Sequence, residues 1–157
     1  MALVAEYQNA RRDEDVARLR RVLALRAMAA TGMSQRQIAD ALGVTQPAVS
    51  QQLKFAPDLD DVHPEVLLHA AAPILKTLAA ENGYSRLAAF GSVARHEARK
   101  DSDIDLLVEA PEGTSSFDFI SFKQLIAHVL GRDIDLVSYG GLKTKLDDDI
   151  RREAVLL

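Results

Sequence analysis

A glycine–serine pair, followed by two aspartates at alternate positions, constrains this chain more than any other feature of its sequence. Gly91-Ser92 comes after an apolar run that ends at Phe90, which predicts a strand, a tight turn and a short helix. The first N–H groups of a helix have no internal partner, and glycine lets an anion approach them closely. We therefore expect Gly91 and Ser92 to hold a phosphate group.

The two aspartates are Asp103 and Asp105, and ten residues separate Ser92 from the first of them. They belong to an Asp-Ile-Asp-Leu run that predicts a second strand, expected over residues 103–109. Side chains alternate along a strand, so both carboxylates point to one face, while Ile104 and Leu106 point into a core. Two carboxylates on one face repel each other unless a cation lies between them. Magnesium is the natural candidate, because it binds carboxylates together with substrate phosphates.

A third acidic residue lies in a second Asp-Ile-Asp-Leu run, residues 133–136, which predicts another strand. If this strand pairs beside the first run, Asp135 joins Asp103 and Asp105. Three carboxylates next to a phosphate-binding turn are typical of two-metal phosphoryl or nucleotidyl transfer. Each part also has an ordinary interpretation: Asp103 in a capped turn, Asp133 in a loop, and Gly91-Ser92 as any helix start.

Arg95 is expected in the first turn of the short helix, where a positive charge is disfavoured by about 0.3–1 kcal/mol. A bound phosphate would remove this conflict, so Arg95 is a candidate ligand for the phosphate. A salt bridge to Glu97 or Asp101 is the alternative.

The run from Gly91 to Val108, with Asp135 later, resembles the nucleotidyltransferases of the DNA polymerase β superfamily. Its short form is similar to the minimal nucleotidyltransferase (MNT) group. The resemblance covers residues 64–157 and implies an α/β fold, in which helices flank a small three-stranded sheet. It also implies ATP as substrate, magnesium as cofactor, and a role for Asp135 in deprotonating an attacking hydroxyl group. His96 departs from the pattern, since many relatives have glycine there; its side chain either crowds the substrate or faces water.

The N-terminal part has the pattern of an all-helical domain. Residues 13–30 have the spacing of a helix that Asp13 caps and Gly32 ends. Ser34-Gln35-Arg36-Gln37 has the form of a capping box and starts a second helix. Gly43 makes the next turn, and Thr45 caps a third helix. The positions expected inside the two later helices are Ile38, Ala39, Leu42, Val49 and Leu53.

These two later helices resemble the helix-turn-helix of bacterial repressors, which gives a DNA-binding domain over residues 11–54. In that family the second helix enters the major groove, and its outward side chains contact bases and phosphates. The residues assigned to DNA contact are Thr45, Gln46, Pro47, Ser50, Gln51 and Lys54. The alternative is a helical hairpin used for protein contacts.

The balance of charged residues changes sign at the boundary between the two expected domains, after residue 54. Residues 1–54 carry eight Lys/Arg against five Asp/Glu, and residues 55–157 carry eleven against eighteen. A basic front suits nucleic acid, and an acidic rear suits a metal site. Residues 55–63, with proline and acids but no periodicity, predict a linker to the nucleotidyltransferase domain at 64–157.

Three more helices are expected in the second domain. One covers residues 64–82, where Pro73 would kink or divide it, and one lies around 122–130. The apolar positions that space a last helix are Leu142, Leu146, Ile150 and Ala154. The acidic run at 147–149 falls on this helix, and we interpret it as a solvated face rather than a set of ligands.

The chain contains no cysteine, which excludes a disulfide framework and a thiolate zinc site. No apolar run approaches the length that spans a membrane, and the first residues lack the basic start of a signal peptide. We therefore expect a cytoplasmic protein that does not bind a membrane.

The resemblance to MNT antitoxins also implies partners. Those proteins pair with HEPN ribonuclease toxins, and some of them transfer AMP from ATP to a toxin tyrosine. We expect the same transfer to a HEPN-type toxin, autorepression through operator DNA, and a homodimer or hetero-oligomer. One alternative is a DNA-binding regulator whose nucleotidyltransferase domain only binds a partner or a nucleotide. Another is a transferase that acts on a small molecule or RNA.

Overall fold

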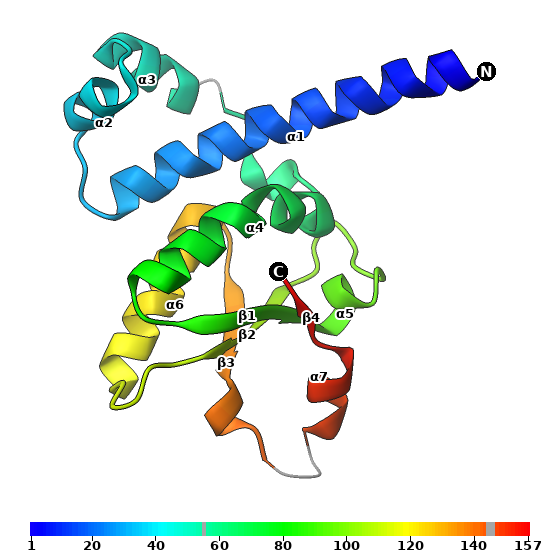
Figure 1. The fold of residues 1–157 in the computed structure, drawn as a ribbon, viewed down its shortest axis with the longest axis vertical. Coiled ribbons are helices and arrows are strands. Elements are labelled where there is room, and N and C mark those ends of the chain that lie inside the picture. The colour runs from blue at the N-terminus through cyan, green and yellow to red at the C-terminus, as the bar shows by residue number, and fades with distance from the viewer. Residues whose placement is uncertain (55, 144–146) are drawn as a thin grey trace. The chain divides into compact units, whose positions relative to one another are not determined.

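The computed structural model describes residues 1–54, 56–143 and 147–157. The chain forms two compact units, Met1–Pro57 and Asp58–Leu157, each of which is described by itself (Figure 1). The division falls within the segment predicted as a linker, of which Phe55 lies outside the described residues.

Three helices form the first unit: α1 (Ala2–Ala30), α2 (Gln35–Leu42) and α3 (Gln46–Lys54). The prediction that the first helix begins at Asp13 is wrong, because α1 begins at Ala2. Residues 2–12 contain neither glycine nor proline, so nothing interrupts the helix before Asp13. Asp13 is therefore an exposed residue inside α1 rather than its cap.

The local signals around the turn of this unit are confirmed. The Gln37 N–H donates to Ser34 Oγ at 3.1 Å, and the Ser34 N–H donates to Gln37 Oε1 at 2.9 Å, which completes the capping box. Gly43 ends α2 in the left-handed region, with φ +70°. The Ala48 N–H then donates to Thr45 Oγ1 at 3.2 Å at the start of α3.

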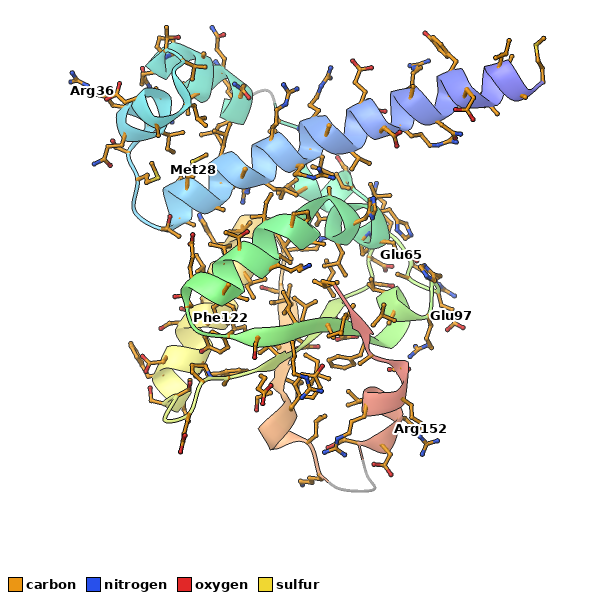
Figure 2. The ribbon with its side chains drawn as sticks, viewed as in Figure 1. Met28, Arg36, Glu65, Glu97, Phe122 and Arg152 are labelled. Atoms are coloured by element: carbon orange, nitrogen blue, oxygen red, sulfur yellow. The ribbon has the colours of Figure 1, made fainter. Side chains whose placement is uncertain are left out.

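A small apolar cluster holds the three helices together. Met28 of α1, which Figure 2 labels, packs against it. Leu42 was expected inside but is 49% exposed, because it is the last residue of α2 and lies beyond the part of α2 that packs on the cluster. The buried members are Leu25, Ile38, Ala39 and Val49, with Met28, Met33 and Leu53 packed against them.

The second unit contains a sheet of four strands in its described part, in the order β3-β2-β1-β4. The strands are β1 (Ser85–Phe90), β2 (Ile104–Glu109), β3 (Ile134–Ser138) and β4 (Val155–Leu156). β1 pairs antiparallel with both β2 and β4, and β2 pairs parallel with β3. The prediction of three strands was wrong, since a strand of two residues has no periodicity to detect.

Helices lie on both faces of this sheet. α4 (Pro64–Glu81) and α6 (Ser116–Leu130) lie on one side, and α7 (Asp148–Glu153) lies on the other (Figure 1). Ile104, Leu106 and Val108 of β2 are fully buried, as predicted. On the α7 side, Leu107 belongs to a second cluster; its members are Ala88, Phe90 and Leu107, with Val137, Tyr139, Leu142, Ile150 and Ala154 against them.

Two expectations about the helices need correction. Pro73 does not divide α4, because Pro73 and His69 are exposed and water can solvate the carbonyl that loses its helical partner. The last helix is shorter than its apolar spacing predicted: Leu142 precedes α7 and Ala154 follows it. Leu146, the fourth position of that spacing, lies outside the described residues.

Replacing Ser34 by alanine removes the side-chain acceptor of the capping box. We expect a loss of about 1 kcal/mol in the free energy of unfolding of the first unit, measured by urea unfolding followed by circular dichroism. Glycine at the same position is the control, because it costs only about a few tenths of a kcal/mol at a helix N-cap. Equal losses for the two variants would contradict a stabilising role for the cap.

Candidate active site

The sheet register brings two of the three predicted carboxylates together. Asp105 of β2 lies directly opposite Asp135 of β3 in the parallel pair. Residues opposite each other in neighbouring strands point to the same face. Phe90 of β1 lies opposite Asp105 on the other side, so the Gly91-Ser92 turn follows immediately beside the same carboxylate. The turn, Asp105 and Asp135 are therefore neighbours across three adjacent strands.

Glycine at position 91 is required by this arrangement. Gly91 begins the short helix α5 (Gly91–Ala94) with φ +70°, in the left-handed region. A Cβ atom added to it would lie 2.2 Å from Asp105 Oδ2 and 3.1 Å from Asp105 Cγ. The Asp105 carboxyl group thus packs directly on the backbone of the turn, at a distance that only glycine allows.

The electrostatics of Asp105 reflect its neighbours. Burial, the charge of Asp135, a hydrogen bond with that residue, and the charges of Asp103 and Glu153 together raise the pKa of Asp105 to about 6, and burial is the largest of these causes. Three other carboxylates therefore act on Asp105 at this point of the sheet. Their repulsion makes the site favourable for a divalent cation.

The carboxylates around Asp105 are the candidate ligands for magnesium. The described side chains contain no set of three His, Asp or Glu residues already arranged to hold a metal. Asp103 lies one residue before β2 and is exposed, as is Asp135. The donors fit magnesium in kind, because it takes carboxylate oxygens and leaves several positions for water and substrate phosphate. Asp105 and Asp135, with Asp103 beside them, are the residues that would hold it.

Glu153, at the end of α7, is a member of this site that the sequence reasoning missed. The Gly91 N–H donates to Glu153 Oε1 at 2.9 Å, and Arg95 Nη1 donates to Glu153 Oε2 at 2.9 Å. Burial alone would raise the pKa of Glu153, but these two hydrogen bonds outweigh it and hold the pKa below its usual value. One signal was available: a negative charge in the last turn of a helix is unfavourable unless it has a partner.

Arg95 lies at a different place in the helix than expected. It is the residue that follows α5, not a residue of its first turn. Its Nε donates to Glu97 Oε2 at 3.1 Å, so the predicted salt bridge to Glu97 is present together with the one to Glu153. Ser92 lies between Gly91 and Arg95 in this segment, half-buried, and its carbonyl accepts from the Glu97 N–H at 2.9 Å.

Glycine would suit position 96, because His96 adopts a backbone conformation that glycine reaches without strain. Its φ is +57°, in the left-handed region, which costs a non-glycine residue about 1–2 kcal/mol. The side chain is 87% exposed, so of the two alternatives it faces water. Its Nδ1 lies 2.9 Å from Glu65 Oε1, a residue that Figure 2 labels at the start of α4.

A cavity of about 460 Å³ adjoins Asp103 at the edge of the sheet where β2 and β3 begin. Arg132, which the sequence reasoning also missed, donates from Nη2 to the carbonyls of Leu59, Asp60 and Val62 at 3.2–3.4 Å. These bonds attach the start of β3 to the segment before α4. The cavity is lined by Asp60, Lys100, Asp101, Ser102, Asp103, Arg132 and Asp133.

The side chains assigned to DNA contact lie on and just before α3. Ser50 is half-buried, whereas the other five are exposed. Gln46 Nε2 donates to Gln35 Oε1 of α2 at 2.6 Å, which fixes its orientation. Arg36 of α2 also projects outward from this unit (Figure 2). The six assigned residues are Thr45, Gln46, Pro47, Ser50, Gln51 and Lys54.

A glycine turn beside paired strand carboxylates, on a small mixed sheet, defines a nucleotidyl-transferring domain. The chain belongs to the nucleotidyltransferase domain family, whose sequence model matches residues 72–157. A homeodomain-like model matches residues 15–54, which agrees with the helix-turn-helix resemblance.

Similar proteins carry consistent names. Protein adenylyltransferase MntA of Thermococcus cleftensis is 36% identical over 80 residues, which are 51% of this chain and 81% of the relative. A protein of Methanocaldococcus jannaschii, provisionally named a protein adenylyltransferase, is 41% identical over 75 residues, 48% of this chain and 81% of the relative. A solved structure provisionally described as a minimal nucleotidyltransferase has a TM-score of 0.53 and 39% identity, covering 66% of this chain and 99% of that one.

Among the helices of the described residues, none combines the length and apolar character needed to cross a lipid bilayer.

Replacing Gly91 by alanine places a methyl group against Asp105. We expect a larger loss of unfolding free energy than for Gly113→Ala, together with loss of nucleotide binding. Gly113 is a matched control in the same unit, because its φ is +82° and an added Cβ would meet nothing within 4 Å. The control is expected to cost about 1–2 kcal/mol from the left-handed backbone alone. Urea unfolding and calorimetry with ATP measure the two effects; equal stability losses would contradict the close contact.

Replacing His96 by glycine relieves the left-handed backbone and gives up the exposed hydrogen bond with Glu65. We expect His96→Gly to unfold at a higher urea concentration than His96→Ala, by a free-energy difference of about 1 kcal/mol. The unaltered protein, with histidine at this position, should have an unfolding free energy equal to or lower than that of the glycine variant. An alanine variant as stable as the glycine variant would show that the backbone conformation carries no cost here.

Proposed function

We propose that this protein is an adenylyltransferase, which transfers AMP from ATP to a hydroxyl group on a partner protein, with magnesium as the cofactor. The observation that carries the proposal is the position of Asp105, opposite Asp135 and packed on the Gly91 turn. The names of the relatives, protein adenylyltransferases, support the choice of AMP and of a protein acceptor.

The geometry supports the following roles. Gly91 and Ser92, with the Arg95 guanidinium, hold the triphosphate. Asp103, Asp105 and Asp135 would hold magnesium, which when bound neutralises the charge of the phosphates.

In the transfer step the acceptor oxygen attacks the α-phosphorus of ATP, and the bond from that phosphorus to the bridging oxygen breaks. Pyrophosphate leaves toward the turn. Asp135, on the side of Asp105 away from the turn, accepts the proton of the attacking hydroxyl group.

The acceptor in this proposal is a tyrosine of a HEPN-type ribonuclease toxin, so the protein serves as the antitoxin of a pair. The basis is the resemblance to MNT antitoxins, together with a relative that bears the name MntA. The partner's hydroxyl group would approach from the β3 side, opposite the turn that holds the leaving group.

Labelled ATP, magnesium and the product of the neighbouring reading frame test the transfer. Label should pass to the neighbour with the unaltered protein and fall at least about a hundredfold with the double variant Asp103→Ala, Asp105→Ala. Asp149→Asn is the control, because this carboxylate on α7 is 92% exposed and should leave transfer unchanged. No label on the neighbour, or label that survives the double variant, would overturn the proposal.

A second function, binding of operator DNA, is favoured by the homeodomain-like match over residues 15–54 and by the exposed face of α3. In this proposal α3 enters the major groove, where Gln46 and Gln51 read bases and Lys54 contacts a phosphate. Two copies of the chain would bind paired half-sites and repress the operon.

A gel-shift assay with the DNA upstream of the reading frame tests this second function. The double variant Gln46→Ala, Gln51→Ala should weaken binding about tenfold or more, since each well-placed base contact contributes about 1–3 kcal/mol. Gln52→Ala is the control on the same helix, because Gln52 is exposed but lies outside the assigned set. If the double variant binds as well as the control, α3 is not the recognition helix.

A further inference from the structure

The carboxylate of Glu153 occupies the donors assigned above to the triphosphate. One of its oxygens accepts from the Gly91 N–H, and the other accepts from Arg95 Nη1, both at 2.9 Å. A phosphate group held by the same turn would use the same backbone N–H and the same guanidinium. Two anions cannot both accept from these donors in this geometry, and their charges repel.

We propose that Glu153 is a built-in competitor, which occupies the phosphate-binding donors in the nucleotide-free protein and must be displaced by the triphosphate of ATP. This inference rests on the proposed nucleotidyl transfer and adds a regulatory step to it. The energy of the two charge-assisted hydrogen bonds to Glu153 is subtracted from the binding energy of the nucleotide.

The surroundings of Glu153 allow it to leave. Its side chain is 24% exposed, so water can reach it. It ends a helix of six residues and is followed closely by the two-residue strand β4. β4 pairs with β1 at Ala88–Leu156 and Ala89–Val155, and the Leu157 N–H donates to the Leu87 carbonyl at 3.0 Å. The charge of Glu153 also acts against that of Asp105, so its departure relieves repulsion at the acidic centre.

Arg95 stays in position when Glu153 leaves. Its Nε donates to Glu97 Oε2 at 3.1 Å, through a different nitrogen from the one that binds Glu153. Glu97, which Figure 2 labels, lies in the loop after α5, and the Gly91 N–H donates to Glu153 instead. The guanidinium is therefore already oriented toward the place of the incoming phosphate.

Calorimetric titration with inorganic tripolyphosphate and with a non-hydrolysable ATP analogue, each with magnesium, tests the inference. The variant Glu153→Gln keeps the size of the side chain but removes its charge, and it should bind both probes about tenfold more tightly. Glu97→Gln is the matched control: it removes an Arg95 partner without freeing the Gly91 N–H, so its affinity should not rise. Equal or weaker binding by Glu153→Gln, or an equal gain in the control, overturns the inference.

A measurement on the unaltered protein covers the case in which Glu153→Gln unfolds. With glutamate labelled with ¹³C at the side-chain carboxyl carbon, the Glu153 signal should move to the position of a solvated carboxylate as tripolyphosphate is added. A Glu153 signal that stays in place while tripolyphosphate binds overturns the inference.

The outcome is separate from that of the transfer assay. If Glu153→Gln binds tripolyphosphate more tightly but no label is transferred, the proposed competition by Glu153 stands and the proposed adenylyltransferase activity is wrong. If label is transferred but Glu153→Gln and the unaltered protein bind tripolyphosphate with equal affinity, the proposed activity stands and the proposed competition by Glu153 is wrong.

Discussion

The contact between the Asp105 carboxyl group and the backbone of Gly91 is the constraint on which the rest of the site depends. A Cβ at position 91 would lie 2.2 Å from Asp105 Oδ2, so the turn and the acidic strand approach too closely for any residue but glycine. In the proposed function, this approach places the N–H groups that would hold a phosphate beside the carboxylates that would hold a metal. Nucleotidyl transfer needs both on the same phosphate chain, and the glycine would provide that proximity.

Packing of the sheet and hydrogen bonds within the protein offset the repulsion between the neighbouring carboxylates. Ile104 and Leu106 flank Asp105 and are fully buried on the opposite face, which fixes the direction of the carboxylate between them. Glu153 reaches the turn from α7 and finds two donors there. The Gly91 turn is thus held by one carboxylate, while other carboxylates repel one another around Asp105. In the proposed function this repulsion favours binding of a cation, whereas the hydrogen bonds to Glu153 oppose binding of the triphosphate.

Local signals in the sequence predicted most of the elements. The strand ending at Phe90, the alternation of Asp103 to Val108, and the capping box at Ser34 depend on neighbours within a few residues. Errors arose where local pattern was weak or continuous. α1 begins eleven residues before the predicted cap because its first residues are all compatible with a helix. The sequence pattern did not predict β4, because two residues are too few to show an alternation of side chains. It predicted too long a helix at α7, because the same apolar spacing also fits a short helix with its flanking loops.

The sequence by itself determined which chemical groups are present and their order: a glycine turn, alternating aspartates and a later Asp-Ile-Asp-Leu strand, each set by short-range preference and spacing. Only the tertiary structure decided which groups meet. The register of two parallel strands put Asp135 opposite Asp105, and a contact between residues 62 positions apart put Glu153 on the Gly91 N–H. Such pairings depend on how strands and helices pack across the whole unit, and short-range preferences do not encode that packing.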